Sequence, residues 1–145
     1  MALVEKSVLI EYSAAQMYAL VENVSAYPEF LPWCGGTEIL KRDGEITRAA
    51  ITIDYRGIRQ RFSTENRAQP QQLIEMTLVE GPFRQLDGSW RFKALGDDAC
   101  KVEFRLHYEF SSKLLEKIFG PVFHFIAGTF VDAFVKRAQQ LYGKR

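Results

Sequence analysis

Hydrophobic and polar residues alternate with a period of two along most of the chain between Thr37 and Phe110. Because successive side chains on a β-strand point to opposite faces, this alternation predicts strands with one apolar and one polar face. Turn-forming residues separate the segments, namely Asp43-Gly44, Gly57, Pro70, Gly81-Pro82 and Gly96-Asp97-Asp98. Short connections of this kind join antiparallel neighbours, so we expect a meander of about six strands over this region.

The flanking segments predict one further strand and two helices. Residues Leu3 to Glu11 favour a strand. Ser13 and Gln16 form a capping-box pattern, which indicates a short helix from Ser13 to about Asn23. Ser111 and Ser112 can cap the first turn of a last helix. Apolar residues follow the helical period from Phe119 onward, and Gly120-Pro121 either kinks this helix or restarts it.

These elements predict an α+β fold with two layers, in which a long Phe-rich C-terminal helix lies across a curved antiparallel sheet of about six to seven strands. The length of 145 residues, 47% of them hydrophobic, suits one domain spanning 1–145. Only fourteen uncharged residues separate Lys117 from Asp132, so we expect no membrane-spanning segment. No leader sequence is recognisable after Met1, and we expect a cytoplasmic protein.

Few residues favour catalysis or metal binding. His107 is expected on the polar face of its strand, and His124 is expected in the core or at a cavity edge. Cys34 and Cys100 lie far apart without metal-ligand spacing, and Cys34 is expected to be a buried thiol. Nucleotide-binding and hydrolase motifs are absent from the sequence. We therefore predict no catalytic residue, no metal site and no obligatory cofactor.

The apolar interior is the strongest candidate for a function. Large residues on the inward parity either fill the core or line a cleft between the sheet and the last helix, where an extended hydrophobic ligand would fit. The candidate ligand-binding residues are Leu31, Trp33, Tyr55, Phe62, Met76, Phe83, Trp90, Phe92, Phe104, Tyr108, Phe123, Ile126 and Phe130.

Basic residues gather in two places. They are Arg48, Arg56, Arg59, Arg61 and Arg67 on the predicted sheet and Lys136, Arg137, Lys144 and Arg145 near the C-terminus. Such residues either form an ordinary solvated surface or contact anionic lipid headgroups or RNA phosphates. The formal net charge of only +1 is not typical of a dedicated nucleic-acid-binding protein.

Several motifs resemble one family along the whole chain. They are Tyr27-Pro28-Glu29-Phe30-Leu31-Pro32-Trp33-Cys34, Gly81-Pro82-Phe83, Trp90-x-Phe92 and Ala133-Phe134-x-x-Arg137-Ala138. The chain thereby resembles the START-like (polyketide cyclase) superfamily, in the branch of coenzyme Q-binding proteins and bacterial ribosome-association toxins. The resemblance implies a helix-grip fold, a deep cavity between sheet and helix, and a lipid-like ligand.

The family resemblance leaves three functions open. The first expectation is a non-enzymatic carrier of ubiquinone or another isoprenoid lipid that supports respiration and contacts the inner membrane peripherally. Its ligand ring would lie near Trp33, Phe83 and Tyr108. The alternative is a ribosome-association toxin of a toxin–antitoxin system that blocks subunit joining through its basic outer face and C-terminal tail. A cyclase-type enzyme is the third, and the lack of an acid–base constellation argues against it.

Overall fold

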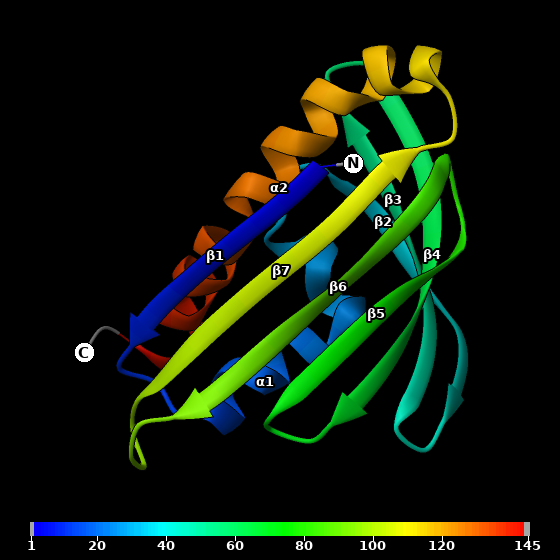
Figure 1. The fold of residues 1–145 in the computed structure, drawn as a ribbon. Coiled ribbons are helices and arrows are strands. Elements are labelled where there is room, and N and C mark those ends of the chain that lie inside the picture. The colour runs from blue at the N-terminus through cyan, green and yellow to red at the C-terminus, as the bar shows by residue number, and fades with distance from the viewer. Residues whose placement is uncertain (1, 144–145) are drawn as a thin grey trace.

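A computed structural model describes residues 2–143, and this part of the chain forms one seven-stranded sheet, two α-helices and a 3-10 helix (Figure 1). The strands are β1 (Ala2–Ile10), β2 (Cys34–Asp43), β3 (Ile46–Tyr55), β4 (Ile58–Gln69), β5 (Leu73–Glu80), β6 (Phe83–Ala94) and β7 (Cys100–Phe110). The helices are α1 (Ala14–Glu22), the 3-10 helix η1 (Val24–Glu29) and α2 (Lys113–Tyr142). The predicted fold class is confirmed.

The strand order is β1-β7-β6-β5-β4-β3-β2, and every pair is antiparallel. Strands β2 to β7 form a meander because each connection is a short turn. Strand β1 pairs with β7, where Ala2 lies opposite Tyr108. The sheet curves, and α2 and α1 lie on its concave side (Figure 1).

The first helix begins as the capping pattern predicts. The Ser13 hydroxyl accepts a hydrogen bond from the Gln16 backbone N–H at 3.0 Å, and the Gln16 side chain accepts one from the Ser13 N–H at 2.9 Å. The turn-rich segment that follows contains η1, in which the Tyr27 hydroxyl donates to the Val21 carbonyl. Burial raises the pKa of Tyr27, so its hydroxyl stays protonated.

Helix α2 begins at Lys113, directly after the two serines that the sequence offered as caps. The Ser112 hydroxyl accepts a hydrogen bond from the Leu115 backbone N–H at 3.1 Å, which caps a helix that then continues through Pro121. Its buried residues are Phe123, Ile126, Ala127, Val131, Phe134 and Ala138. They pack towards the sheet and α1, as the helical period predicts.

Helix α2 is apolar over much of its length. By length and composition, the helix contains an 18-residue window that is apolar enough to cross a membrane, although only 14 consecutive residues lack charge. Only 28% of this window is buried inside the molecule. Helix α2 therefore carries apolar surface beyond what the core covers.

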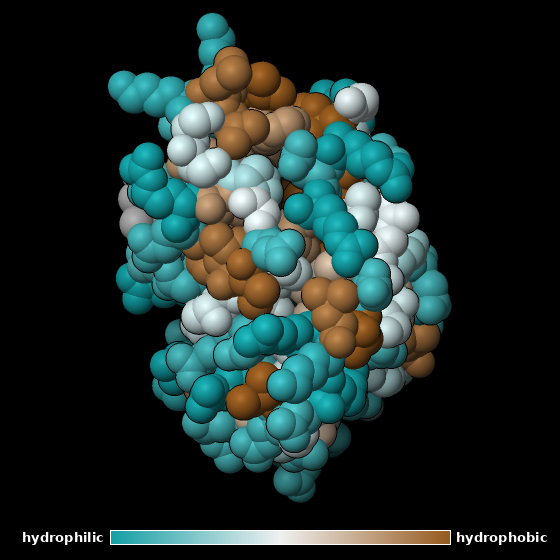
Figure 2. Space-filling model, turned by 90° about the vertical axis from the view of Figure 1, so that its right-hand side faces the viewer, coloured by the Kyte–Doolittle hydropathy of each residue, from teal (hydrophilic) through white to brown (hydrophobic). Residues whose placement is uncertain are grey.

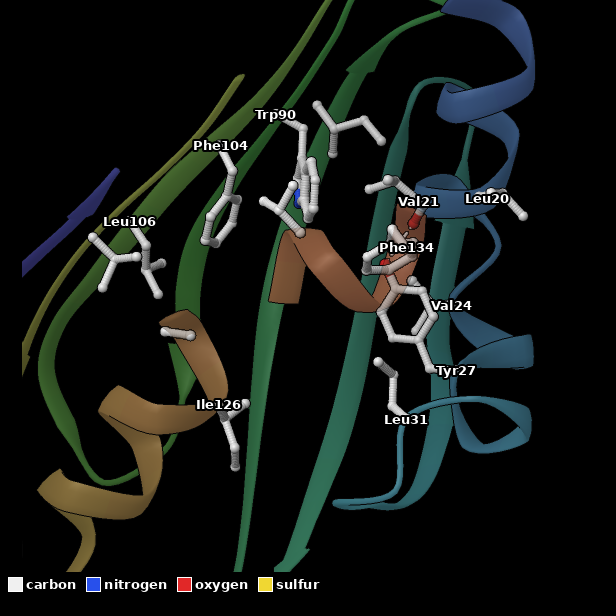
Figure 3. Close-up of a cluster of buried hydrophobic side chains, with 14 of the residues drawn as sticks. Leu20, Val21, Val24, Tyr27, Leu31, Trp90, Phe104, Leu106, Ile126 and Phe134 are labelled. Carbon is white, nitrogen blue, oxygen red and sulfur yellow. Dashed lines mark hydrogen bonds between the residues drawn. The ribbon is translucent and has the colours of Figure 1, made fainter. Parts of the chain in front are cut away.

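The core joins the sheet to both α-helices and to η1. Trp90 of β6 and Phe104 of β7 point towards α2, while Val21 and Tyr27 approach from the opposite side (Figure 3). Phe134 lies among them and is 1% exposed.

Candidate functional site

A cavity of about 190 Å³ lies between the concave face of the sheet, α1 and α2. This volume exceeds the roughly 150 Å³ of an apolar cavity that binds benzene, and it is below the roughly 300–1,000 Å³ of pockets that enclose drug-sized ligands. The cavity can therefore enclose a ring or a short chain. A longer isoprenoid would have to extend beyond it.

Small side chains leave this space open. Ala49 of β3, Ala68 of β4 and Ala127 of α2 all line the cavity. Ala49 and Ala127 are 2% and 4% exposed, so both small side chains lie in the interior and not at the surface. Protein interiors are normally close-packed. Here the alanine side chains are too short to fill the space between sheet and helices, which leaves the cavity.

The wall of the cavity is apolar except along β3 and β4. Thr64 is buried and donates a hydrogen bond to Oδ1 of Asn66 at 2.8 Å. In the sheet register, Asn66 lies opposite Thr47 of β3 and Met76 of β5. Thr64 and these three residues all line the cavity. Once Oδ1 of Asn66 has accepted this bond, the side chain still carries two N–H donors. This polar strip can recognise a carbonyl or ether oxygen on an otherwise apolar ligand.

A charged rim marks the opening of the cavity. Glu22 of α1 and Arg42 of β2 line it and form an ion pair at 2.9 Å, with half-exposed side chains. Tyr18 also lies at this rim; burial and the nearby carboxylates of Glu22 and Glu45 raise its pKa. A hydrophobic ligand would enter past these polar groups, between α1 and the β2–β3 hairpin.

Eight of the thirteen candidate ligand-binding residues line this cavity. They are Trp33, Phe62, Met76, Trp90, Phe104, Phe123, Ile126 and Phe130. Their contact with a ligand stays a prediction.

The other five candidates do not line the cavity. Leu31 is 1% exposed in the core, and Phe92 packs against Trp90. Tyr55 stacks outside it on Phe125.

The remaining two, Phe83 and Tyr108, belong to a packed aromatic cluster around Phe123. The Tyr108 hydroxyl also lies 3.1 Å from Nδ1 of His124. Of the three residues expected around the ligand ring, only Trp33 lines the cavity.

Sequence reasoning missed several lining residues. Asn66 and Thr47 share the inward parity of their strands, so the alternation could have identified them. Val21 and Tyr27 come from α1 and η1, and the sequence pattern does not show how these helices are placed against the sheet.

Both cysteines are free and buried, as expected for Cys34. Burial raises the pKa values of the Cys34 and Cys100 thiols, which are therefore protonated at neutral pH. His124 is exposed on α2, which corrects its expected place in the core or at a cavity edge. Within residues 2–143, no group of three metal-ligating side chains occurs.

The basic face of β3 and β4 is largely neutralised by acidic neighbours. Arg48 pairs with Glu65 at 3.1 Å, and Arg61 pairs with Glu38 at 3.0 Å. Arg59 pairs likewise with Asp54, and near the C-terminus Arg137 pairs with Glu29. Lys144 and Arg145 lie outside the described residues.

Comparison with known proteins adds independent information. Residues 10–135 match the family model described as polyketide cyclase / dehydrase and lipid transport. The ribosome association toxin RatA of Pseudomonas aeruginosa is 43% identical over 140 residues, covering 97% of each chain. The mitochondrial coenzyme Q-binding protein COQ10 homolog B of Xenopus laevis is 28% identical, covering 97% of this chain and 59% of that one.

Solved structures share the same architecture. An 18 kDa protein from Caulobacter crescentus is 32% identical with a TM-score of 0.76, covering 99% of this chain and all of that one. An aromatase/cyclase from a Streptomyces species has a TM-score of 0.80 at 16% identity, covering 96% of this chain and 94% of that one. At such low identity, the second likeness supports the fold alone.

Proposed function

The chain belongs to the polyketide cyclase / dehydrase and lipid transport family, and from this membership we propose that it is a bacterial ribosome-association toxin of the cytoplasm. The observation that carries the proposal is the 43% identity to a protein named as such a toxin, over nearly the full length of both chains. In this role it would bind a ribosomal subunit and prevent subunit joining. The sequence-based expectation put the lipid carrier first and the toxin second, and the proposal reverses this ranking.

The proposed contact with the ribosome uses the outer face of β3 and β4. Arg48 and Arg61 are about half exposed, so phosphate oxygens can replace the carboxylates that now pair with them. Arg67 lies on the same polar parity of β4 and is also exposed. Because Arg48 and Arg61 must first leave their acidic partners, we expect modest affinity with a clear dependence on salt.

Expression of the chain in a bacterium is expected to shift ribosomes towards free subunits in sucrose-gradient sedimentation. The triple variant Arg48→Ala, Arg61→Ala and Arg67→Ala is expected to restore most whole ribosomes, since it removes the proposed phosphate contacts.

The control carries three alanines elsewhere on the outer sheet, at Arg91, Lys93 and Lys101. It should behave like the unchanged chain. An unaltered sedimentation profile after expression of the unchanged chain would refute the toxin proposal.

The cavity supports a second role within the same protein, the binding of a mainly apolar molecule with an oxygen acceptor. Ubiquinone fits this description, because its ring carries carbonyl and ether oxygens and its tail is an isoprenoid. We propose that the ring occupies the enclosed volume near Thr64 and Asn66 and that the tail leaves past the rim. The distant coenzyme Q-binding relative supports this ligand class.

Both tryptophans of the chain, Trp33 and Trp90, line the cavity, so quenching of intrinsic fluorescence measures occupancy. We expect Thr64→Val or Asn66→Leu to weaken binding of a short-chain ubiquinone about threefold to tenfold, which corresponds to one lost hydrogen bond. The matched control is Thr77→Val on an exposed position of β5. Equal affinity in all three variants would contradict the polar strip as a recognition element.

A further inference from the structure

Helix α2 carries an exposed apolar stripe over its first half. It consists of Leu114, Ile118, Pro121 and Phe125, whose spacing of four, three and four residues places them on one face of the helix. Leu114, Ile118 and Phe125 are 67%, 46% and 52% exposed. At 1.5 Å per residue the stripe is about 17 Å long. It ends before Asp132, which occupies the same face.

Cations border this stripe. Lys113 and Lys117 lie along one edge of it on α2, and both are exposed. On the neighbouring β3–β4 turn, the Arg56 guanidinium lies 5.2 Å from the centroid of the Tyr55 ring, which itself stacks on Phe125 at 6.0 Å. Within residues 2–143, none of these three cations forms an ion pair.

Hydrophobic and hydrophilic side chains therefore meet at the end of the molecule where α2 begins. The same end is at the top of Figure 2, where brown side chains gather beside projecting teal ones. An apolar face bordered by Lys and Arg is typical of helices that lie in the interface of a membrane with anionic lipids.

We propose that the stripe and its three bordering cations dock on an anionic lipid bilayer. In this arrangement Leu114, Ile118 and Phe125 enter the boundary between headgroups and acyl chains, while Lys113, Lys117 and Arg56 contact lipid phosphates. Exposed Glu116 is the one acidic residue in the first turn of α2 and is outnumbered by these cations.

A second copy of the chain fits the same surface less well. A stable protein interface buries roughly 800 Å² on each partner and usually contains few lysines at its centre. Four separated side chains on a stripe about 17 Å long offer less area than this. Two copies packed face to face would also bring their lysine edges together. A bilayer both accepts the apolar side chains and neutralises the cations.

This surface is separate from the cavity opening. The rim at Glu22 and Arg42 belongs to α1 and to the end of β2 at the β2–β3 hairpin, in the lower half of the molecule in Figure 1, whereas α2 begins at the upper end. Docking can therefore be tested without altering a residue of the ligand site or of the proposed ribosome-binding face.

Flotation with phosphatidylcholine vesicles containing phosphatidylglycerol tests the proposal. The unchanged chain is expected to float with these vesicles and to do so about tenfold less with pure phosphatidylcholine, because the electrostatic attraction is lost. The double variant Ile118→Asp and Phe125→Asp is expected to lose at least about tenfold in binding. Lys113→Glu with Lys117→Glu should remove the preference for anionic vesicles.

Leu9→Asp provides the matched control, because Leu9 is 70% exposed on β1 and lies outside the stripe. This variant should float like the unchanged chain, and circular dichroism should show that every variant is folded. The proposal is overturned if the stripe variants bind vesicles as well as the Leu9 variant does. It is equally overturned if the unchanged chain ignores vesicles but forms a dimer, or binds a ribosomal subunit, through the stripe.

Discussion

Replacing Phe134 with alanine is expected to lower the free energy of unfolding by about 3–5 kcal/mol. Phe134 is 1% exposed and makes edge-to-face ring contacts with Tyr27, Phe30, Trp90 and Phe130. These contacts join α2 to η1 and to β6, so truncation leaves a void that three elements border. Urea denaturation followed by circular dichroism measures the loss.

The same substitution at Phe125 is the control for this prediction. Phe125 is 52% exposed on α2 and contacts the Tyr55 ring. Because little of its surface leaves water on folding, we expect a loss below about 1 kcal/mol. Similar losses at the two positions would mean that α2 is not anchored to the sheet through Phe134.

A leucine in place of Ala127 is expected to weaken binding of a short-chain ubiquinone by at least about tenfold, since the larger side chain occupies the volume the ligand needs. Ala127 lines the cavity and is 4% exposed. Extra methyl groups in a well-packed core usually cost about 1–3 kcal/mol, whereas a side chain that enters a void costs little. The thermal midpoint should therefore stay near that of the unchanged chain.

Ala133→Leu tests whether this effect belongs to the cavity. Ala133 is on the same helix, is half-buried and does not line the cavity. The variant should bind the quinone normally, as monitored by tryptophan fluorescence. If Ala127→Leu instead unfolds the protein and leaves no binding to measure, the space beside Ala127 is already filled and the ligand proposal fails.

Much of the fold was predictable because the alternation of apolar and polar residues is a local pattern that recurs along the strands. The parity of Phe62 and Thr64 on β4 follows from pleating alone, and the structure places both on the cavity wall. The capping pair Ser13 and Gln16 is equally local, and its two hydrogen bonds form as expected. The family resemblance drawn from motifs such as Tyr27 to Cys34 is also confirmed.

The candidate site was only partly predictable, because parity gives the face of a residue and not its position along the groove. Tyr108 lies on the inward face of β7, yet α2 passes directly over it and its hydroxyl contacts His124. Tyr55 lies near the end of β3, where it stacks on the outward-facing Phe125 instead of entering the cavity. Such differences depend on where the helix crosses the sheet, which no local pattern specifies.

The pairing of β1 with β7 has a consequence for how the chain is made. Ala2 leaves the ribosome long before its partner Tyr108, and α2 follows later still. Contacts between such distant segments form late, because the intervening chain must first be ordered. A nascent chain consequently cannot close its interior before α2 has left the ribosome.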